Sequence, residues 1–181
     1  MTREAPLEHT ETGLVAAEEG WFVLNAQDAR WRHGEGRGAR LEFDGETKFP
    51  QVGINLFVLA PGETMAMYHW EADQEDFLVL SGAALLIIEG EERPLRQWDF
   101  VHCPAETKHT IVGAGDAPCA VLAVGAREHQ SGTDWGGYTV DDAALRHRAG
   151  VDRETTEVDE AYARFPGREP MRSGEGWLPD N

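Results

Sequence analysis

From Trp21 to Gly125 the chain is a succession of short apolar runs separated by glycine and proline. The runs are rich in Val, Ile, Leu and Phe, and breakers such as Pro61-Gly62 and Ser81-Gly82 divide them. Apolar runs of this length suit strands, and no helical periodicity lies between them. The pattern therefore predicts an all-β domain, a sandwich or a barrel. The strands are expected over Trp21–Leu24, Arg40–Phe43, Gly53–Leu59, Asp76–Leu80, Ala83–Glu89, Asp99–Cys103, Thr110–Val112 and Ala120–Val124.

The segments on either side of this region differ from it in character. Residues 1–20 are polar and acidic and are expected to form a mobile or loosely docked arm before a barrel at 21–127. Residues 128–181 are expected to form an extension with short helices over Asp142–Arg148 and from about Glu157 to Arg164. Glycine and proline recur in the last fifteen residues, which predicts a disordered end.

The composition excludes several classes of partner. With 33 acidic and 16 basic residues among 181, the formal net charge is −17, which repels phosphate backbones and anionic membranes. No apolar stretch is long enough to span a bilayer, and no basic start followed by an apolar run indicates a signal peptide. We therefore expect no nucleic acid partner, no membrane partner and a cytoplasmic location. Cys103 and Cys119 are too few for a disulfide framework and are interpreted as buried, reduced thiols.

Chemically informative residues are concentrated between Pro61 and His109. Side chains two residues apart in a strand share a face, so His69 and Glu71 are expected to point the same way. Glu75 opens the next predicted strand, and pairing of that strand with the first would return Glu75 to the same end of a barrel. An imidazole and two carboxylates on one inner surface suit a divalent cation that accepts nitrogen and oxygen ligands.

A second group of residues follows at the end of the next strand pair. The strand that ends at Pro104 is followed by a short turn, and His109 begins another strand. Such a turn would bring His109 back into the barrel as a further nitrogen ligand.

These two stretches resemble the motifs of the cupin superfamily. The first cupin motif is Gly-x5-His-x-His-x3–4-Glu-x6-Gly, and Gly62, His69, Glu75 and Gly82 fit it, with Glu71 in place of the second histidine. The second is Gly-x5-Pro-x-Gly-x2-His-x3-Asn, which Pro104 and His109 fit. Fifteen residues, from Ala83 to Gln97, separate the motifs, and this short separation is typical of microbial cupins. The resemblance implies a double-stranded β-helix, the cupin or jelly-roll barrel.

The sequence also departs from these motifs. Six residues rather than five lie between Gly62 and His69. Trp98, Glu106 and Gly113 stand where Gly, Gly and Asn are usual in the second motif.

The resemblance implies one divalent transition metal, with Fe, Mn, Zn and Ni as the alternatives, bound by His69, Glu71, Glu75 and His109. For Glu71 three roles remain open, namely a fourth ligand, which we favour, a general base and a solvent-facing carboxylate. No separate catalytic acid or base is assigned.

Residues around the metal are expected to form an apolar pocket. Phe77 and Val79 share the parity of Glu75 and should line it. Tyr68 and Trp70 are placed at its rim, where either could stack on a flat ligand. Of His102 and Cys103, only one can face inward, and neither is taken as a ligand.

The resemblance leaves three functions open. The favoured one is a metal-dependent enzyme, dioxygenase-like or decarboxylase/isomerase-like, acting on a small organic acid or aromatic. The others are a non-catalytic cupin that binds a small metabolite and a barrel with a purely structural metal. In each of the first two the partner is a small molecule. The resemblance also implies a homodimer, since cupin barrels commonly pair through an edge strand, with the N-terminal strands or C-terminal helices as alternative covers for such an edge.

Overall fold

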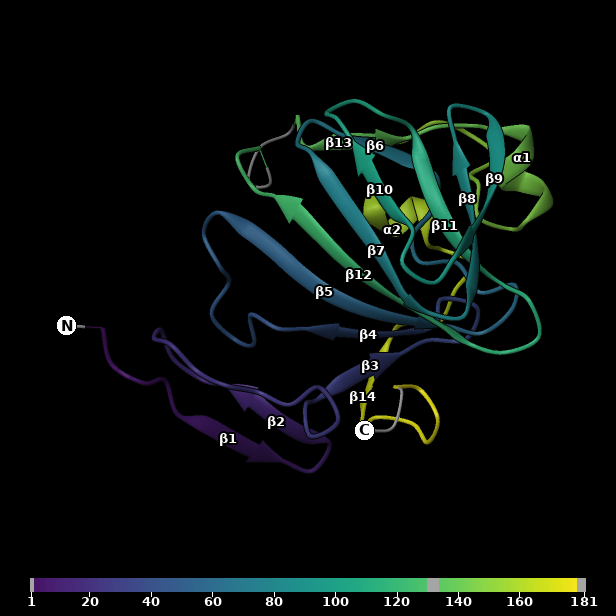
Figure 1. The fold of residues 1–181 in the computed structure, drawn as a ribbon. Helices are drawn as coiled ribbons and strands as arrows, with labels where there is room; N and C mark the ends of the chain where they lie inside the picture. The colour runs from purple at the N-terminus through teal and green to yellow at the C-terminus, as the bar shows by residue number, and fades with distance from the viewer. Residues whose placement is uncertain (1, 130–133, 179–181) are drawn as a thin grey trace.

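The computed structural model describes residues 2–129 and 134–178, which fold into two large antiparallel sheets and a separate hairpin (Figure 1). The seven-stranded sheet has the order β10-β7-β12-β5-β4-β3-β14, and the five-stranded sheet has the order β13-β6-β11-β8-β9. The first comprises β3 (Trp31–His33), β4 (Ala39–Glu42), β5 (Val52–Leu59), β7 (Glu75–Ser81), β10 (Phe100–Cys103), β12 (Cys119–Ala126) and β14 (Glu169–Met171). The second comprises β6 (His69–Glu71), β8 (Ala83–Ile88), β9 (Glu91–Arg96), β11 (His109–Ala114) and β13 (Gly136–Tyr138). The predicted all-β double-stranded β-helix is confirmed.

The main core fills the space between the two sheets. Its members alternate along each strand with residues that face outward, as in Phe77 and Val79 of β7 or Ala84 and Leu86 of β8. Ile111 of β11 is fully buried in the same cluster. Because both sheets contribute to this cluster, the barrel interior is closed by apolar side chains over most of its length.

The outer faces of both sheets are also covered. Phe57 and Leu59 of β5 face the main core, whereas Leu56 and Val58 face a second cluster around Trp31. Burial on both faces explains why residues 56–59 of β5 form a continuous apolar run rather than an alternating one. On the five-stranded sheet, helix α1 (Asp142–Arg146) covers the outer face.

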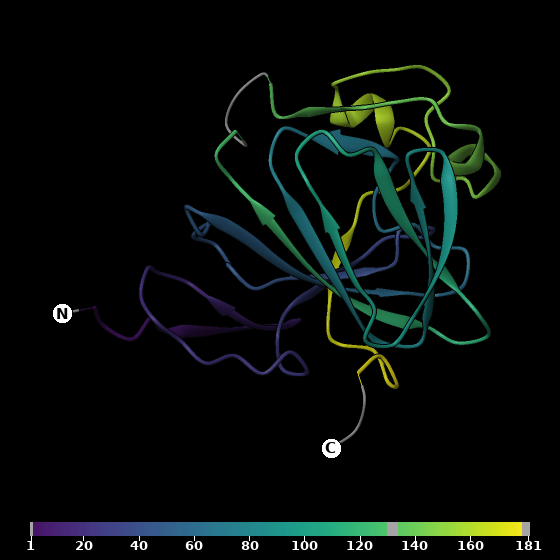
Figure 2. The same ribbon diagram turned by 45° about the horizontal axis from the view of Figure 1, so that its top comes forward.

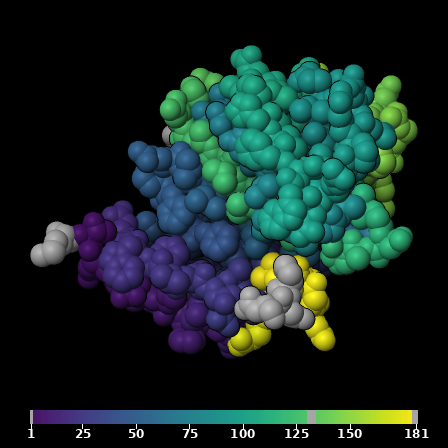
Figure 3. Space-filling view, viewed as in Figure 1, coloured from purple at the N-terminus to yellow at the C-terminus, as the bar shows by residue number. Residues whose placement is uncertain are grey.

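The N-terminal segment forms β1 (Leu7–Thr10) and β2 (Gly13–Ala16), which lie beside the barrel in purple (Figures 1 and 3). Main-chain hydrogen bonds between Leu14 and residues 28 and 30 attach this hairpin to the segment before β3. Val15 and Ala16 of this hairpin are buried. The predicted strand at Trp21–Leu24 is wrong, since Trp21 forms only an isolated bridge to Glu4.

The C-terminal segment returns to the seven-stranded sheet (Figure 2). β14 pairs with β3, and the Trp177 ring packs edge-on against Trp31 at 5.3 Å between centroids. The predicted disordered end therefore does not hold for 169–178, because this segment covers the apolar outer face around Trp31. Residues 179–181 of that predicted end lie outside the described residues.

Two helices follow the barrel, close to their predicted positions. α1 begins after Asp141, whose carboxylate caps the helix by accepting a hydrogen bond from the Ala144 amide. The second helix, α2 (Val158–Ala161), is shorter than predicted. In the described part of the chain, neither helix has the length and apolar character needed to cross a membrane.

Candidate metal centre

Two imidazoles come from neighbouring strands of the five-stranded sheet. His69 opens β6 and His109 opens β11, and the two residues lie directly opposite each other in the antiparallel pairing. Opposed residues of an antiparallel pair project from the same face, so the two rings lie side by side, with centroids 5.0 Å apart. Their exposed fractions are only 6% and 1%.

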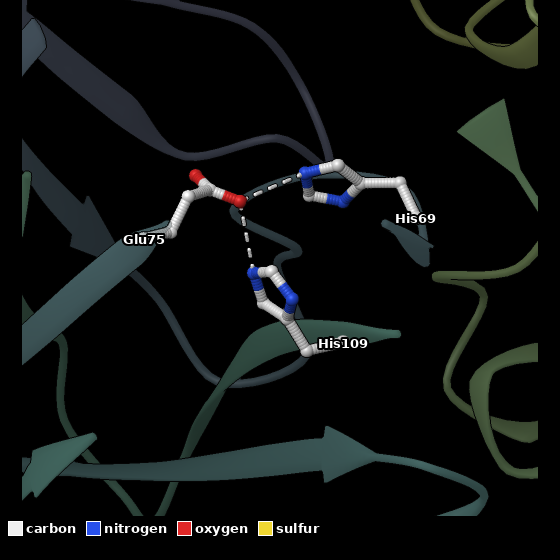
Figure 4. Close-up of side chains that lie close together, drawn as sticks. All are labelled: His69, Glu75 and His109. Atoms are coloured by element: carbon white, nitrogen blue, oxygen red, sulfur yellow. Dashed lines mark ion pairs between the residues drawn. The ribbon is translucent and has the colours of Figure 1, made fainter. Parts of the chain in front are cut away.

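Glu75 reaches the imidazoles from the opposite sheet. It opens β7, which pairs with β10 and β12 and not with β6, because residues 72–74 carry the chain from one sheet to the other. The expected pairing of the Glu75 strand with the His69 strand is therefore wrong, but Glu75 still lies beside the two imidazoles. Glu75 Oε2 lies 3.5 Å from His69 Nε2 and 3.2 Å from His109 Nε2 (Figure 4).

Hydrogen bonds on the far side of each ring determine which nitrogen is free. His69 Nδ1 lies 2.8 Å from the Met67 carbonyl oxygen, and His109 Nδ1 lies 2.9 Å from that of Thr107. A carbonyl oxygen can only accept, so each Nδ1 donates and carries the ring proton. In the neutral rings both Nε2 lone pairs therefore point toward Glu75. Main-chain carbonyls orient metal-binding histidines in this way.

Three electron-rich atoms thus face one another away from solvent. Within residues 2–129 and 134–178, His109 Nε2 and Glu75 Oε2 are buried and have no hydrogen-bond partner. The donor atoms of His69, Glu75 and His109 all lie within 4.8 Å of one another. Donors about 2.1 Å from a shared ion lie about 3 to 3.5 Å apart, so the residues present fit a cation.

The charges in the cluster favour a cation as well. Burial raises the pKa of Glu75, but the close imidazoles of His109 and His69 outweigh burial and hold its pKa below the ordinary value. Burial lowers the pKa of His69, but Glu71 and Glu75 outweigh that effect and raise its pKa well above the ordinary value. Glu75 is thus ionised at neutral pH, and without a metal His69 holds a proton in the position that a metal would take.

Glu71 lies beside this cluster rather than in it. It shares a face of β6 with His69, as predicted, and its Oε1 is 3.6 Å from His69 Nε2. Its side chain is 31% exposed, and it lies outside the group whose donors are all within 4.8 Å of one another. The structure brings three of the four predicted ligands together and leaves Glu71 at the more accessible side. Its role as a ligand stays a prediction.

The residues predicted to line a pocket divide into two pairs. Phe77 is buried with its ring 5.2 Å from that of His109, and Val79 is buried in the same core. Tyr68 instead faces the opposite side of β6 from His69, packs under α1 and accepts a hydrogen bond from the Gly90 amide. Tyr68 is therefore not at the pocket rim, where it was expected. Trp70 also faces away from His69, by strand alternation, and its indole lies over Gly137.

His102 and Cys103 face opposite ways, as alternation requires. His102 is on the exposed side, where its Nδ1 lies 2.7 Å from Asp76. Cys103 is buried, and burial together with the nearby Glu75 charge raises its pKa to about 12. The thiol is therefore protonated at neutral pH.

The departures from the second motif have a backbone explanation. Trp98 and Glu106 stand where the motif has glycine, and both have a left-handed backbone, with φ of 75° and 68°. The glycine-like conformation is thus kept without glycine. The Glu106 amide donates to the Glu71 carbonyl at 2.7 Å, which ties the turn before His109 to the end of β6.

One residue near the metal centre comes from outside the predicted barrel. Tyr138 of β13 lies opposite His69 in the strand pairing, with ring centroids 6.0 Å apart. Its position depends on a strand pairing between segments nearly seventy residues apart, and neither cupin motif includes it.

Comparisons with known proteins agree with this fold. Residues 55–125 match the family model of the cupin domain, and this stretch contains His69, Glu75 and His109. This stretch of the chain is therefore a cupin domain. No curated protein matches the chain.

Solved structures of diverse proteins resemble parts of the chain. A sugar phosphate isomerase of a cupin superfamily from Silicibacter pomeroyi is 31% identical, over 56% of this chain and 62% of its own, with a TM-score of 0.44. The polyketide cyclase RemF from Streptomyces resistomycificus is 14% identical, over 59% and 79%, with a TM-score of 0.51. The capsular polysaccharide assembling protein CapF from Staphylococcus aureus is 20% identical, over 63% and 35%, with a TM-score of 0.52. The chain spans less than two thirds of the isomerase, and the likeness to RemF and CapF concerns the fold alone.

Proposed function

We propose that this protein is a metal-dependent enzyme that acts on a small organic acid or aromatic compound. One divalent transition metal, Fe, Mn, Zn or Ni, would be held by His69, Glu75 and His109. The observation that carries the proposal is the convergence of two imidazole Nε2 atoms on Glu75 Oε2, at 3.5 and 3.2 Å, in a buried space. A mixed set of imidazole and carboxylate donors suits these metals.

The number of donors favours an enzyme over a structural site. Structural zinc sites are closed by four protein ligands, whereas catalytic sites keep a position for substrate. Here three donors converge, and Glu71 lies at the more accessible side as the candidate fourth ligand or general base. A metal of this type supplies either polarisation of a carbonyl group or activation of O₂, hence isomerase-, decarboxylase- or dioxygenase-like activity.

The other residues around the centre have supporting roles in this proposal. The carbonyls of Met67 and Thr107 hold the two imidazoles in orientation. Phe77, packed against His109, excludes water from the core side of the centre. Glu71 has two candidate roles in this proposal, the fourth metal ligand or the general base that accepts a proton from a bound substrate.

The experiment is to purify the protein without added metal and to measure its metal content. The Fe(II)-loaded protein is then given a panel of small carboxylic acids and catechols, and O₂ consumption and CO₂ release are followed. One metal per chain with turnover of a panel member is the expected result. One metal per chain without any turnover would favour the non-catalytic, metabolite-binding cupin, and absence of metal binding would contradict the proposal.

A further inference from the structure

Three arginines converge on the inner side of the seven-stranded sheet. Arg40 of β4 pairs with Phe57 of β5 and so shares the face that Phe57 presents to the main core. The Arg40 guanidinium carbon lies 5.7 Å from the Phe57 ring centroid, and that of Arg168 lies 5.9 Å from it. Arg37, in the turn between β3 and β4, is joined to them because Arg168 Nη2 donates to the Arg37 carbonyl at 2.7 Å. We refer to Arg37, Arg40 and Arg168 as the arginine cluster.

A series of ring contacts connects this cluster to the metal centre. The guanidinium of Arg37 lies 3.8 Å above the Tyr162 ring, which packs edge-on against Tyr138 at 5.7 Å. Tyr138 in turn lies 6.0 Å from the His69 ring. Burial raises the pKa of Tyr138 most, while the charge of Glu71 raises it further and that of Arg37 lowers it. The charges of both Glu71 and Arg37 therefore act on Tyr138.

The positive charges of the cluster are poorly matched by the protein itself. Glu42 pairs with Arg40 at 2.5 Å but is shared with Lys48 at 3.2 Å. In the described part of the chain, the Nε atoms of all three arginines are buried without a hydrogen-bond partner.

Bringing the positive charges of the three arginines together away from water costs free energy. The pKa of Arg168 is lowered to about 9, most by burial and then by the charges of Arg37 and Arg40. Concentrating cations away from water is unfavourable unless an anion joins them. The chain carries many carboxylates, since its net charge is −17. Among residues 2–129 and 134–178, however, Arg37 is stacked on an aromatic ring and forms no ion pair.

We propose that the arginine cluster binds an oxyanion of the substrate, a carboxylate or a phosphate group, while the metal centre holds the reacting end. This inference rests on the proposed function and narrows its substrate class to anions. Planar guanidinium groups bind both oxyanions through paired hydrogen bonds, and stacking on aromatic rings holds them in orientation for this. The Arg40 side chain is 31% exposed and so can be reached by a ligand.

The test uses Arg37→Gln, because Arg37 contributes its aromatic contact with Tyr162 rather than the main-chain hydrogen bonds that Arg168 donates. Arg93→Gln on β9 is the matched control, since it removes the same charge from a side chain that is 64% exposed. Inorganic phosphate and, separately, succinate are titrated calorimetrically at constant ionic strength into metal-loaded and metal-stripped protein. The stripped protein separates anion binding at the cluster from anion binding at the metal.

We expect saturable binding of phosphate or succinate to the metal-stripped wild-type protein. Whichever of the two binds more tightly identifies the group recognised as a phosphate or a carboxylate. Arg37→Gln should weaken that binding about tenfold or more, and Arg93→Gln should change it less than about twofold. Absence of saturable binding, or equal weakening by both variants, would overturn the inference. Anion binding that persists in a protein unable to hold metal would support the cluster while contradicting the proposed function.

Discussion

At the residue scale, the metal centre depends on short-range main-chain contacts as much as on the distant strands that assemble it. In both His69 and His109 the ring Nδ1 donates to the carbonyl two residues earlier, at Met67 and Thr107. The tautomer of each imidazole is thus set by the residues just before its own strand, and only the position of Glu75 depends on the opposite sheet. Both Nε2 atoms can therefore accept a metal or a proton, but not both at once.

This competition predicts that metal binding depends on pH. Because the pKa of His69 is raised, its ring is protonated below that pKa and must release the proton when the metal binds. The apparent affinity should rise by about tenfold per pH unit below the pKa of His69 and level off above it. Calorimetry at pH 7 in buffers of different ionisation enthalpy should detect close to one released proton per metal. An affinity that does not change with pH would contradict this prediction.

At the scale of elements, turn geometry rather than strand composition fixes how consecutive strands connect. Gly82, between β7 and β8, has a φ of 73°, and a Cβ there would lie 2.8 Å from the Cys119 Cα and from the Pro118 carbonyl oxygen. Gly62 also has a positive φ, of 84°, but a Cβ there would meet nothing within 4 Å. A side chain at Gly62 would therefore meet backbone strain alone, whereas one at Gly82 would meet both backbone strain and steric contact.

Alanine substitution at each glycine should separate the two effects quantitatively. We expect Gly62→Ala to cost about 1 kcal/mol in the free energy of unfolding, from its left-handed backbone alone. Gly82→Ala should cost at least about 2 kcal/mol more, because the methyl group meets backbone atoms that cannot move aside cheaply. Urea denaturation of both variants measures the difference. Equal costs for the two variants would show that the turn before β8 is not tightly packed.

Predictability from sequence also varies from element to element. β5 and β8 could be predicted because burial makes them apolar, whereas β9, with the sequence EERPLR, is an exposed edge strand that carries no apolar pattern. Strand alternation predicts that His69 and Glu71 share a face. It does not predict that Glu75 arrives from the other sheet, since that depends on how residues 72–74 cross between sheets. Nor does any local pattern indicate Tyr138 or the arginine cluster, which tertiary packing alone brings near.

At the scale of the whole molecule, segments far apart in sequence are joined by a buried ion pair. Arg127, just after β12, contacts Asp44, in the loop after β4, at 2.8 Å, and the two side chains are only 7% and 1% exposed. The same Arg127 nitrogen donates to the Phe49 carbonyl oxygen at 2.7 Å. The pair attaches the loop between β4 and β5 to the end of the barrel.

Removing one member of this pair should strongly destabilise the protein. We expect Asp44→Asn to lower the free energy of unfolding by about 3 kcal/mol or more, because it leaves the buried Arg127 charge without its carboxylate. Glu160→Gln is the control, since its ion pair with Arg153 is exposed and should contribute less than about 1 kcal/mol. Urea denaturation of both variants is the measurement. Similar losses would contradict a structural role for the buried pair.

The surface of the barrel also suggests how two copies would meet. β10 is an edge strand of the seven-stranded sheet, and Phe100 on it and Trp98 just before it are 64% and 66% exposed. An exposed apolar edge favours pairing with a second chain, so we propose a homodimer through β10. Light scattering after size-exclusion chromatography should show a dimer for the wild type and a monomer for Phe100→Lys. A monomeric wild type, or a dimer unchanged by the substitution, would contradict this interface.

The central claim is that His69, Glu75 and His109 together hold one metal ion, and the metal content of purified variants tests it most directly. His109→Ala removes a ring that contacts Glu75, whereas His102→Ala removes an exposed ring on β10, which belongs to the other sheet. Elemental analysis should find about one metal per chain in the wild type and in His102→Ala, as expected of a single site. It should find almost none in His109→Ala, with the circular dichroism of a folded barrel unchanged. Full metal occupancy in a folded His109→Ala protein would contradict the assignment of this centre.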